Sequence, residues 1–385
     1  FLGLGPELQQ LHPRDRRLPQ GRPRGQAVGA HPPHRRQGGA HRLAAHSLRS
    51  GQRQGRAALG RGAVPCSAGH PADLPAYGDS AGGGVAAAGG HHLLFYGPPG
   101  SGKSMLASRL PSILPTLLPE EILEVSMIHS LAGLLKNGTL ESLRPYRDPH
   151  HSASAPAIAG GGPKAKPGEI SLAHRGVLFL DELPEFNRNV LETLRQPLET
   201  GKISIARAEA HITYPARVQM VAAMNPCRCG EVDPVTQICA RGPRCSTQYQ
   251  ARISAPLYDR IDLYLDVPPV RASDLSLPPP KEGSHDVALR VQTARDIQTQ
   301  RYAVYPKQNR PHCNAEAEGE ILDRIAFLGP KEKELMQQAS EKFKLSARAY
   351  HRVLKVSRTI ADLDSQDMIQ TKHIAESLRY RKPKK

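Results

Sequence analysis

One short loop in this sequence has the residue types and spacing needed to bind phosphate. It consists of Gly97, Pro98, Pro99, Gly100, Ser101, Gly102, Lys103 and Ser104. Its glycines allow backbone N–H groups to turn toward phosphate oxygens at a helix N-terminus, where the helix dipole favours anions. Lys103 is expected to reach the β- and γ-phosphates of a nucleotide, and the Ser104 hydroxyl to bind Mg²⁺. The alternative is a chance glycine-rich turn.

Two adjacent carboxylates suit the same chemistry. Asp181 and Glu182 follow the apolar run 177–180. Asp181 is predicted to hold the Mg²⁺ shell, and Glu182 to act as general base by polarising the attacking water. The alternative is a strand that merely ends in an acidic turn. Asn225 ends a second apolar run, 218–224, and is predicted to orient the same water, unless it only caps a turn.

The elements around these residues can be read from the apolar pattern. Residues 93–96 predict a buried strand before the loop, and 105–110 a helix that Pro111 ends. The runs 177–180 and 218–224 are typical of central parallel strands, whose carboxyl ends face a bound nucleotide. Between them the pattern predicts a helix over 187–200, with apolar residues on one face, and then a β-hairpin.

Four of the six cysteines lie close together in the sequence. Cys227, Cys229, Cys239 and Cys245 offer the four thiolates of a closed tetrahedral Zn²⁺ site, which would be structural. The first pair is C-x-C, tighter than the usual spacing. The alternative is a set of four reduced thiols.

A basic segment with paired histidines lies between the two catalytic motifs. Residues 145–167 include His150, His151, Lys164 and Lys166 among glycines and prolines. Such a segment could contact DNA phosphates, or it could be a solvated loop.

The region after the second apolar run predicts a separate helical unit. Residues 271–286 are rich in proline and are expected to be a linker. Beyond them, helices are predicted over 287–301, 316–327, 331–344, 347–363 and 371–379. The sequence therefore predicts an α/β fold: a P-loop αβα sandwich with a parallel sheet over 85–270, followed by a small all-α lid over 287–382.

These motifs, in this order, resemble the AAA+ ATPases, and more closely the magnesium-chelatase-related competence proteins of the ComM/YifB group. The resemblance rests on the segments 86–92, 149–154, 168–186, 225–227, 252–254 and 257–262. It implies ATP and Mg²⁺ as ligands, a homo-hexameric ring, and an ATPase that remodels branched or single-stranded DNA in competence or recombination. Two alternatives stay open: the ATPase subunit of a metal-chelatase-type complex, and an inactive nucleotide-binding fragment.

The resemblance also implies roles for two arginines. Arg260 corresponds to the arginine finger that reaches the γ-phosphate bound by a neighbouring subunit, and Arg348 to sensor 2. A guanidinium suits both roles because it keeps its charge and matches phosphate oxygens with a planar fork. Without the family, either arginine could equally be a solvated surface residue.

The N-terminal segment has a different composition from the rest of the chain. Residues 1–90 hold 12 Arg against four acidic residues, and so carry half of the net charge of +16, yet they contain no Lys, Ile, Met, Asn or Thr. The codons for all five missing residues begin with adenine, and selection for folding would not remove these residues together. We therefore interpret this segment as a frame-shifted or truncated N-terminus. The alternative is an Arg-rich arm that binds nucleic acid. On either reading, residues 1–84 are expected to be disordered.

The chain has no long apolar run and no secretory signal pattern. A cytoplasmic protein without a membrane partner is therefore expected. Net positive charge alone suggests a polyanionic partner.

Overall fold

The computed structural model describes residues 80–135, 139–162, 165–207, 210–230, 239, 242–270 and 282–381. The prediction for residues 1–84 falls almost wholly outside these residues. Its last part is helical, because helix α1 runs over Ser80–Gly89.

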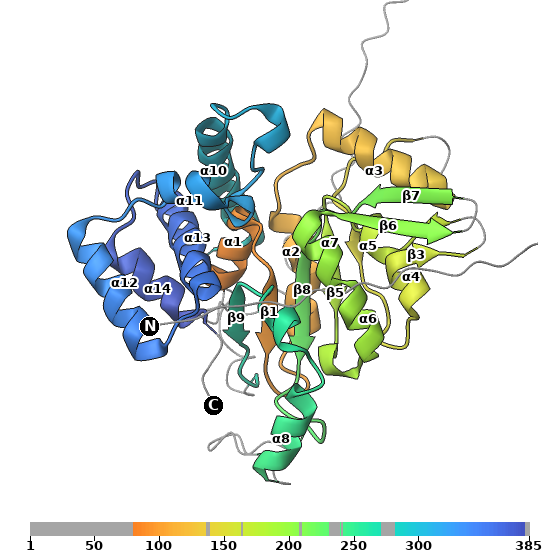
Figure 1. The fold of residues 1–385 in the computed structure, drawn as a ribbon, viewed down its shortest axis with the longest axis horizontal. Coiled ribbons are helices and arrows are strands. Elements are labelled where there is room, and N and C mark those ends of the chain that lie inside the picture. The colour runs from red at the N-terminus through yellow and green to blue at the C-terminus, as the bar shows by residue number, and fades with distance from the viewer. Residues whose placement is uncertain are drawn as a thin grey trace, which may run out of the picture. The chain divides into compact units, whose positions relative to one another are not determined.

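A parallel sheet forms the centre of the α/β part (Figure 1). Its order is β2 (Tyr146–Arg147), β5 (Val177–Leu180), β8 (Gln219–Met224), β1 (Leu93–Tyr96) and β9 (Leu263–Asp266). Every neighbouring pair is parallel. All five strands therefore end at one edge, which we call the carboxyl edge, and begin at the other, the amino edge.

Successive residues of each strand point to opposite faces of the sheet and enter separate hydrophobic cores. Leu94, Leu178 and Met220 belong to one core, whereas Leu93, Val177 and Val221 belong to the other. Burial on both faces explains why these strands are continuous apolar runs. The first core is covered by short elements: α4 (Ala155–Ala159), α5 (Glu169–Leu172), η1 (Leu183–Glu185), α6 (Arg188–Thr193), α7 (Arg195–Thr200) and α9 (Ala255–Tyr258). The predicted αβα sandwich is confirmed.

Two predicted helix boundaries were wrong. Helix α2 runs over Lys103–Ile113 and contains Pro111, which was expected to end it. Pro111 lies in the last turn, where the helix ends two residues later and few hydrogen bonds remain to be lost. The helix expected over 187–200 is divided at Leu194 into α6 and α7. Helices α3 (Pro119–Ala132) and α8 (Pro243–Gln250) were not predicted.

Two β-hairpins lie together beside the sheet (Figure 1). One pairs β6 (Lys202–Arg207) with β7 (Ala210–Pro215), and the other pairs β3 (Gly160–Gly161) with β4 (Lys166–Pro167). A Cβ at Gly160 would lie 2.7 Å from Ile205 Cδ1, and Tyr214 donates a 2.9 Å hydrogen bond to the Ala165 carbonyl. The hairpins are therefore packed against each other.

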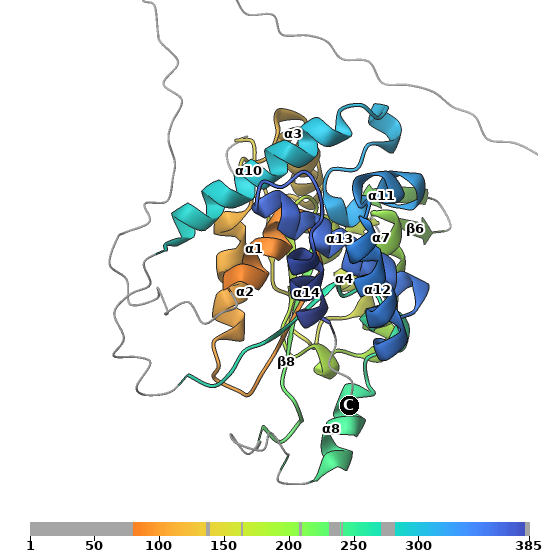
Figure 2. The same cartoon turned by 90° about the vertical axis from the view of Figure 1, so that its left-hand side faces the viewer.

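The C-terminal part is all helical, as predicted (Figure 2). Its longer helices are α10 (Ser284–Tyr302), α11 (Gly319–Ile325), α12 (Pro330–Phe343), α13 (Ala347–Leu363) and α14 (Thr371–Arg379). Two 3₁₀ turns, η3 (Lys307–Asn309) and η4 (Asn314–Glu316), follow α10. Helix α13 joins two cores: Val356 and Ile360 pack with the sheet, whereas Val353 and Leu354 pack among the helices.

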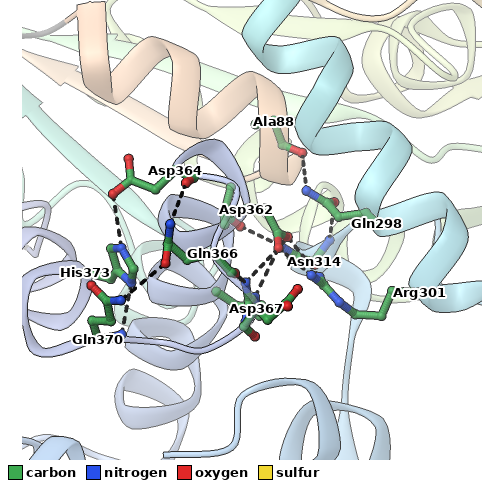
Figure 3. Close-up of polar contacts among 12 residues, drawn as sticks. Ala88, Gln298, Arg301, Asn314, Asp362, Asp364, Gln366, Asp367, Gln370 and His373 are labelled. Carbon is green, nitrogen blue, oxygen red and sulfur yellow. Dashed lines mark hydrogen bonds and ion pairs between the residues drawn. The ribbon is translucent and has the colours of Figure 1, made fainter.

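A buried polar network ties the helical part to the α/β part (Figure 3). Asn314 is fully buried and donates hydrogen bonds to Asp362 at 2.8 Å and to Thr359 at 3.0 Å. Thr359 in turn contacts His91 Nε2 at 2.8 Å, just before β1. Gln298 donates to the Ala88 carbonyl at the end of α1. Both helices α10 and α13 are thus fixed to the amino edge of the sheet.

Candidate functional site

The predicted phosphate loop connects β1 to α2 at the carboxyl edge of the sheet. A Cβ at Gly97 would lie 2.1 Å from the Val267 carbonyl oxygen, so only glycine allows the chain to pass β9 there. Gly100 and Gly102 have φ angles of +74° and +89°, the left-handed region that glycine tolerates. The glycines therefore shape the loop as the sequence predicts.

The Lys103 ammonium points into this loop. Its Nζ donates hydrogen bonds to the carbonyls of Gly97 at 3.0 Å and Pro98 at 2.6 Å, and to Ser101 Oγ at 3.3 Å. Burial lowers the pKa of Lys103, and the charges of Asp181 and Glu182 oppose that shift. The cation and both acidic side chains therefore belong to one electrostatic site.

The strand order brings the predicted motifs together. Strand β8 lies between β1 and β5, with Met224 opposite Tyr96 and Leu180 opposite Ala222. The Gly97 N–H donates to the Met224 carbonyl at 3.3 Å. Asn225, the next residue, therefore begins beside the phosphate loop.

Ser104 and Asp181 meet directly, although 77 residues separate them in the sequence. The Ser104 hydroxyl donates a 2.6 Å hydrogen bond to Asp181 Oδ2. Hydroxyl and carboxylate oxygens are ligands that Mg²⁺ prefers. This pair, beside a phosphate loop with an inward-pointing lysine, fits a magnesium–nucleotide complex.

Glu182 has an unusual backbone and an unexpected neighbour. Its φ and ψ of 49° and 47° are left-handed, which is uncommon for a residue other than glycine and often marks a functional site. Its Oε2 lies 3.4 Å from His151 Nδ1. This contact was not predicted, because the strand that leads to His151, β2, is only two residues long and leaves no pattern.

The basic segment 145–167 is less open than either sequence interpretation assumed. Arg147 forms a bidentate pair with Glu169, with N–O distances of 2.6 and 2.8 Å, and Arg144 binds the Arg175 carbonyl. Ile158 is fully buried. Asp148 lies near Asp181, and burial followed by this like charge raises the pKa of Asp148. The first part of the segment therefore lines the carboxyl edge.

Arg260 and Arg348 lie together, away from the phosphate loop. Arg260 Nη2 is 2.6 Å from Glu199 Oε2, and Arg348 Nη2 is 3.6 Å from Glu199 Oε1. The segment after Arg260 is held at the amino edge, since the N–H groups of Asp262 and Leu263 bind the His92 carbonyl. A four-residue strand spans about 13 Å. Both arginines are thus separated by the length of the sheet from their own chain's loop.

The four clustered cysteines converge at the carboxyl edge. Their sulfur atoms all lie within 4.8 Å of one another, and Cys229 Sγ is 3.2 Å from both Cys227 Sγ and Cys239 Sγ. A tetrahedral site with metal–sulfur bonds of about 2.3 Å has sulfur atoms about 3.8 Å apart. The cluster could therefore hold a metal ion.

In the described part of the chain, no helix is both long and apolar enough to cross a membrane. The cytoplasmic location stays a prediction.

A five-stranded parallel sheet, a phosphate loop between β1 and α2, acidic residues after β5 and a helical C-terminal part together define an AAA+ P-loop protein. A family model described as "Magnesium chelatase, subunit ChlI" matches residues 81–275, and one for the ChlI C-terminal region matches residues 281–381. The chain belongs to the magnesium chelatase ChlI family, which confirms the resemblance found in the sequence.

Curated relatives extend this comparison. The chain is 46% identical over 288 residues to competence protein ComM of Haemophilus influenzae, which covers 74% of this chain and 55% of the relative. It is 45% identical over 294 residues to the uncharacterized protein YifB of Escherichia coli, covering 74% and 54%. Similarity to the maternal DNA replication licensing factor mcm6 of Xenopus tropicalis is lower, at 25% over 219 residues, covering 55% and 25%. The chain spans about half the length of the bacterial relatives.

Proposed function

We propose that the protein hydrolyses ATP and uses the energy to remodel DNA. The observation that carries the first part is the 2.6 Å contact between Ser104 and Asp181, next to the Lys103 ammonium. Two separate segments, 97–104 and 181–182, bring the phosphate loop, the proposed Mg²⁺ ligand pair and the proposed carboxylate base to one edge of the sheet.

Each residue has a distinct task in the proposed reaction. The loop N–H groups and Lys103 bind the β- and γ-phosphates and leave the γ-phosphorus open to a water molecule. Ser104 and Asp181 would hold Mg²⁺, which would supply positive charge to the phosphate oxygens. Glu182 accepts a proton from the attacking water, and Asn225 orients that water. The bond to the β–γ bridging oxygen breaks, which yields ADP and phosphate.

We propose that the working unit is a ring, with a hexamer as the family resemblance implies. Arg260 and Arg348 lie at the amino edge, so in the chain that carries them they are remote from the phosphate loop. Another copy can offer its bound nucleotide to them. Phosphate would then take the place of Glu199, because a nucleotide carries more negative charge than one carboxylate.

The DNA part of the proposal rests on the relatives and on one hairpin. The similar proteins include a competence protein and a DNA replication licensing factor, by their names. The β3–β4 hairpin carries the exposed Lys166 and packs against the β6–β7 hairpin. An exposed lysine on such a hairpin suits phosphate contacts, which depend little on base sequence.

We also propose that the cysteine cluster binds a structural Zn²⁺ ion. Four thiolates form a soft, closed ligand set, which suits zinc and leaves no open position for catalysis.

The test of the main proposal is ATP hydrolysis by the full chain, with and without forked or single-stranded DNA. We expect turnover that DNA accelerates, and replacing Lys164 and Lys166 by Ala should reduce the acceleration more than the turnover without DNA. Hydrolysis that no DNA alters would contradict the DNA part. An assembled protein that binds ATP without hydrolysing it would instead support the inactive fragment.

The ATPase subunit of a metal-chelatase-type complex is the second candidate, because the matching family model carries that description. It predicts hydrolysis that responds to partner subunits and is indifferent to DNA. The same assay therefore separates the two candidates.

A further inference from the structure

The cysteine cluster (Cys227, Cys229, Cys239 and Cys245) lies against the nucleotide site rather than apart from it. It begins two residues after Asn225, at the end of β8, and its last member lies in the first turn of α8. Figure 1 places α8 below the carboxyl ends of β8 and β1. The contacts of the cluster therefore bear on the loop that holds phosphate.

The first contact joins the cluster to the phosphate loop. Gly230, next to Cys229, has a φ of +71°, and a Cβ there would lie 3.0 Å from Cγ of the Pro99 ring. The backbone of the cluster thus packs directly on the ring of Pro99. Any shift of this backbone would alter the support of the loop.

The second contact joins the cluster to the end of strand β8. The Pro226 carbonyl, between Asn225 and Cys227, accepts hydrogen bonds from Ser246 Oγ at 2.9 Å and from Gln250 Nε2 at 3.2 Å. Gln250 also donates to the Tyr96 hydroxyl at 3.3 Å, at the end of β1. Helix α8 therefore links the strand ends that flank the loop.

The third contact reaches the segment that follows the predicted base. Arg228 Nε lies 3.7 Å from Glu185 Oε1, and Arg252 donates a 2.8 Å hydrogen bond to Glu185 Oε2. Glu185 ends η1, the 3₁₀ turn that starts directly after Glu182. Arg228, between two of the cysteines, and Arg252, just after α8, thus both contact the last residue of this turn.

Apolar burial contributes little to holding this segment in place. Between Asn225 and Arg252, the described residues that are apolar and buried are Cys227, Cys239 and Tyr249. So small an apolar core gives a segment of this length little stabilisation, and a metal ion bound by the four thiolates would add to it.

We infer that the metal-bound cysteine cluster is a brace for the nucleotide site, which holds Pro99, Asn225 and Glu185 in the positions that nucleotide binding requires. The inference rests on the proposed zinc ion and on the proposed binding of nucleotide at Lys103. In this inference the zinc ion stabilises the positions of these residues and contacts neither the nucleotide nor the attacking water.

The experiment measures zinc content and nucleotide affinity of the same samples. The full chain, purified under reducing conditions, should contain about one zinc per chain by elemental analysis. Cys229→Ser and Cys245→Ser should each lose the zinc and weaken binding of a fluorescent ADP analogue by about tenfold or more, a change of about 1.4 kcal/mol. Cys313→Ser, at another buried cysteine, is the matched control and should change neither quantity.

Two further variants keep all four thiols and test the brace if the serine variants unfold. Gly230→Ala presses a methyl group toward Pro99, and Gln250→Ala removes the links to Pro226 and Tyr96. Both should retain zinc and bind the ADP analogue several-fold more weakly. Unchanged affinity in both variants would overturn the brace.

The experiment distinguishes a wrong zinc assignment from a wrong proposed function. Reduced chain that neither contains zinc nor takes it up, or that holds iron instead, would overturn the metal assignment even if DNA stimulates hydrolysis. Zinc present in a chain that binds no nucleotide would overturn the brace and the ATPase proposal together, and would leave the metal site standing.

Discussion

Individual side chains at the carboxyl edge divide the proposed chemistry between binding and turnover. Lys103 lies within the phosphate loop, whereas Glu182 lies beyond the Ser104–Asp181 pair and is half exposed. One residue is placed to hold phosphate and the other to meet water. Replacing them should therefore affect different steps.

Glu182→Gln should bind ATP normally and lose turnover by about 100-fold or more, because glutamine cannot accept the proton of the attacking water. Lys103→Ala should weaken nucleotide binding itself by about tenfold or more, through the loss of charged hydrogen bonds to phosphate. Binding of the fluorescent nucleotide and steady-state hydrolysis measure the two effects. Undiminished hydrolysis by the Glu182 variant would refute its role as the base.

His174 makes the stability of the protein sensitive to acid. Its Nδ1 accepts the Arg217 N–H at 3.1 Å, its Nε2 lies 3.1 Å from Glu124, and its side chain is 2% exposed. Burial lowers the pKa of His174 to about 4. The folded ring is therefore neutral at pH 7, with the proton on Nε2.

Above pH 6.5 this histidine is neutral in both the folded and the unfolded chain, so its effect on stability is constant. Between about pH 6.5 and pH 4 the unfolded chain binds a proton that the folded chain does not, which costs up to about 3 kcal/mol. His174→Asn keeps an acceptor for Arg217 and should flatten the fall in unfolding free energy over this range. Equal slopes in the wild type and the variant would contradict the assignment.

Among the secondary-structure elements, α13 contributes to both the core of the sheet and the core of the helical part. One side of it packs with the strands and the other with α11, α12 and α14, and its Thr359 and Asp362 enter the buried polar network (Figure 3). Within that network Asp362 accepts hydrogen bonds from both Arg301 and Arg358. The helical part and the sheet should therefore unfold together.

Asn314→Ala should lower the free energy of unfolding by about 2–4 kcal/mol, because it leaves the Tyr302 hydroxyl and part of Asp362 buried without their partner. Chemical denaturation followed by circular dichroism would measure it. The exposed Gln337, which bonds only to Glu341 on α12, offers a control: Gln337→Ala should change stability by less than about 0.5 kcal/mol. Similar losses for both variants would show that the network is not a major source of stability.

The sequence predicts these elements best where burial or periodicity is strong. The apolar runs of β1, β5 and β8 and the amphipathic pattern of α13 mark real elements, and the glycine and acidic motifs lie at strand ends as expected. By contrast, β2 is too short to leave a pattern. Helix α3 buries Val125 and Ile128 but leaves Leu123, Met127 and Leu131 exposed, so its apolar residues do not mark a single inward face. The contacts of His151 with Glu182 and of Glu199 with Arg260 were missed because each joins segments distant in the sequence.

For the assembled protein, the placement of the arginines predicts that defective copies can repair one another. A chain with Arg260→Ala keeps its own phosphate loop, and a chain with Lys103→Ala keeps its arginines. Each variant alone should be inactive. Coassembled in equal amounts, they should recover about a quarter of the wild-type hydrolysis, since one interface in four then joins an intact loop to an intact Arg260.

A mixture of Lys103→Ala with Glu182→Gln is the matched control. Both changes lie at the carboxyl edge of one chain, so every phosphate loop in the mixture lacks either its lysine or its base. No recovery is expected. Recovery in this control, or none in the first mixture, would contradict the proposed role of Arg260 between copies.

The opposite placement of the phosphate loop and Arg260 on the sheet also gives any such assembly a direction. A two-fold dimer joins identical surfaces, whereas contact between unlike edges requires a heterologous, head-to-tail interface. Each copy then has one neighbour whose nucleotide it senses and another that senses its own. Such a chain of contacts either closes with rotational symmetry or continues as a helical filament, and the two rims of a closed assembly are different surfaces. A strand of DNA passing through would therefore meet an entrance unlike the exit.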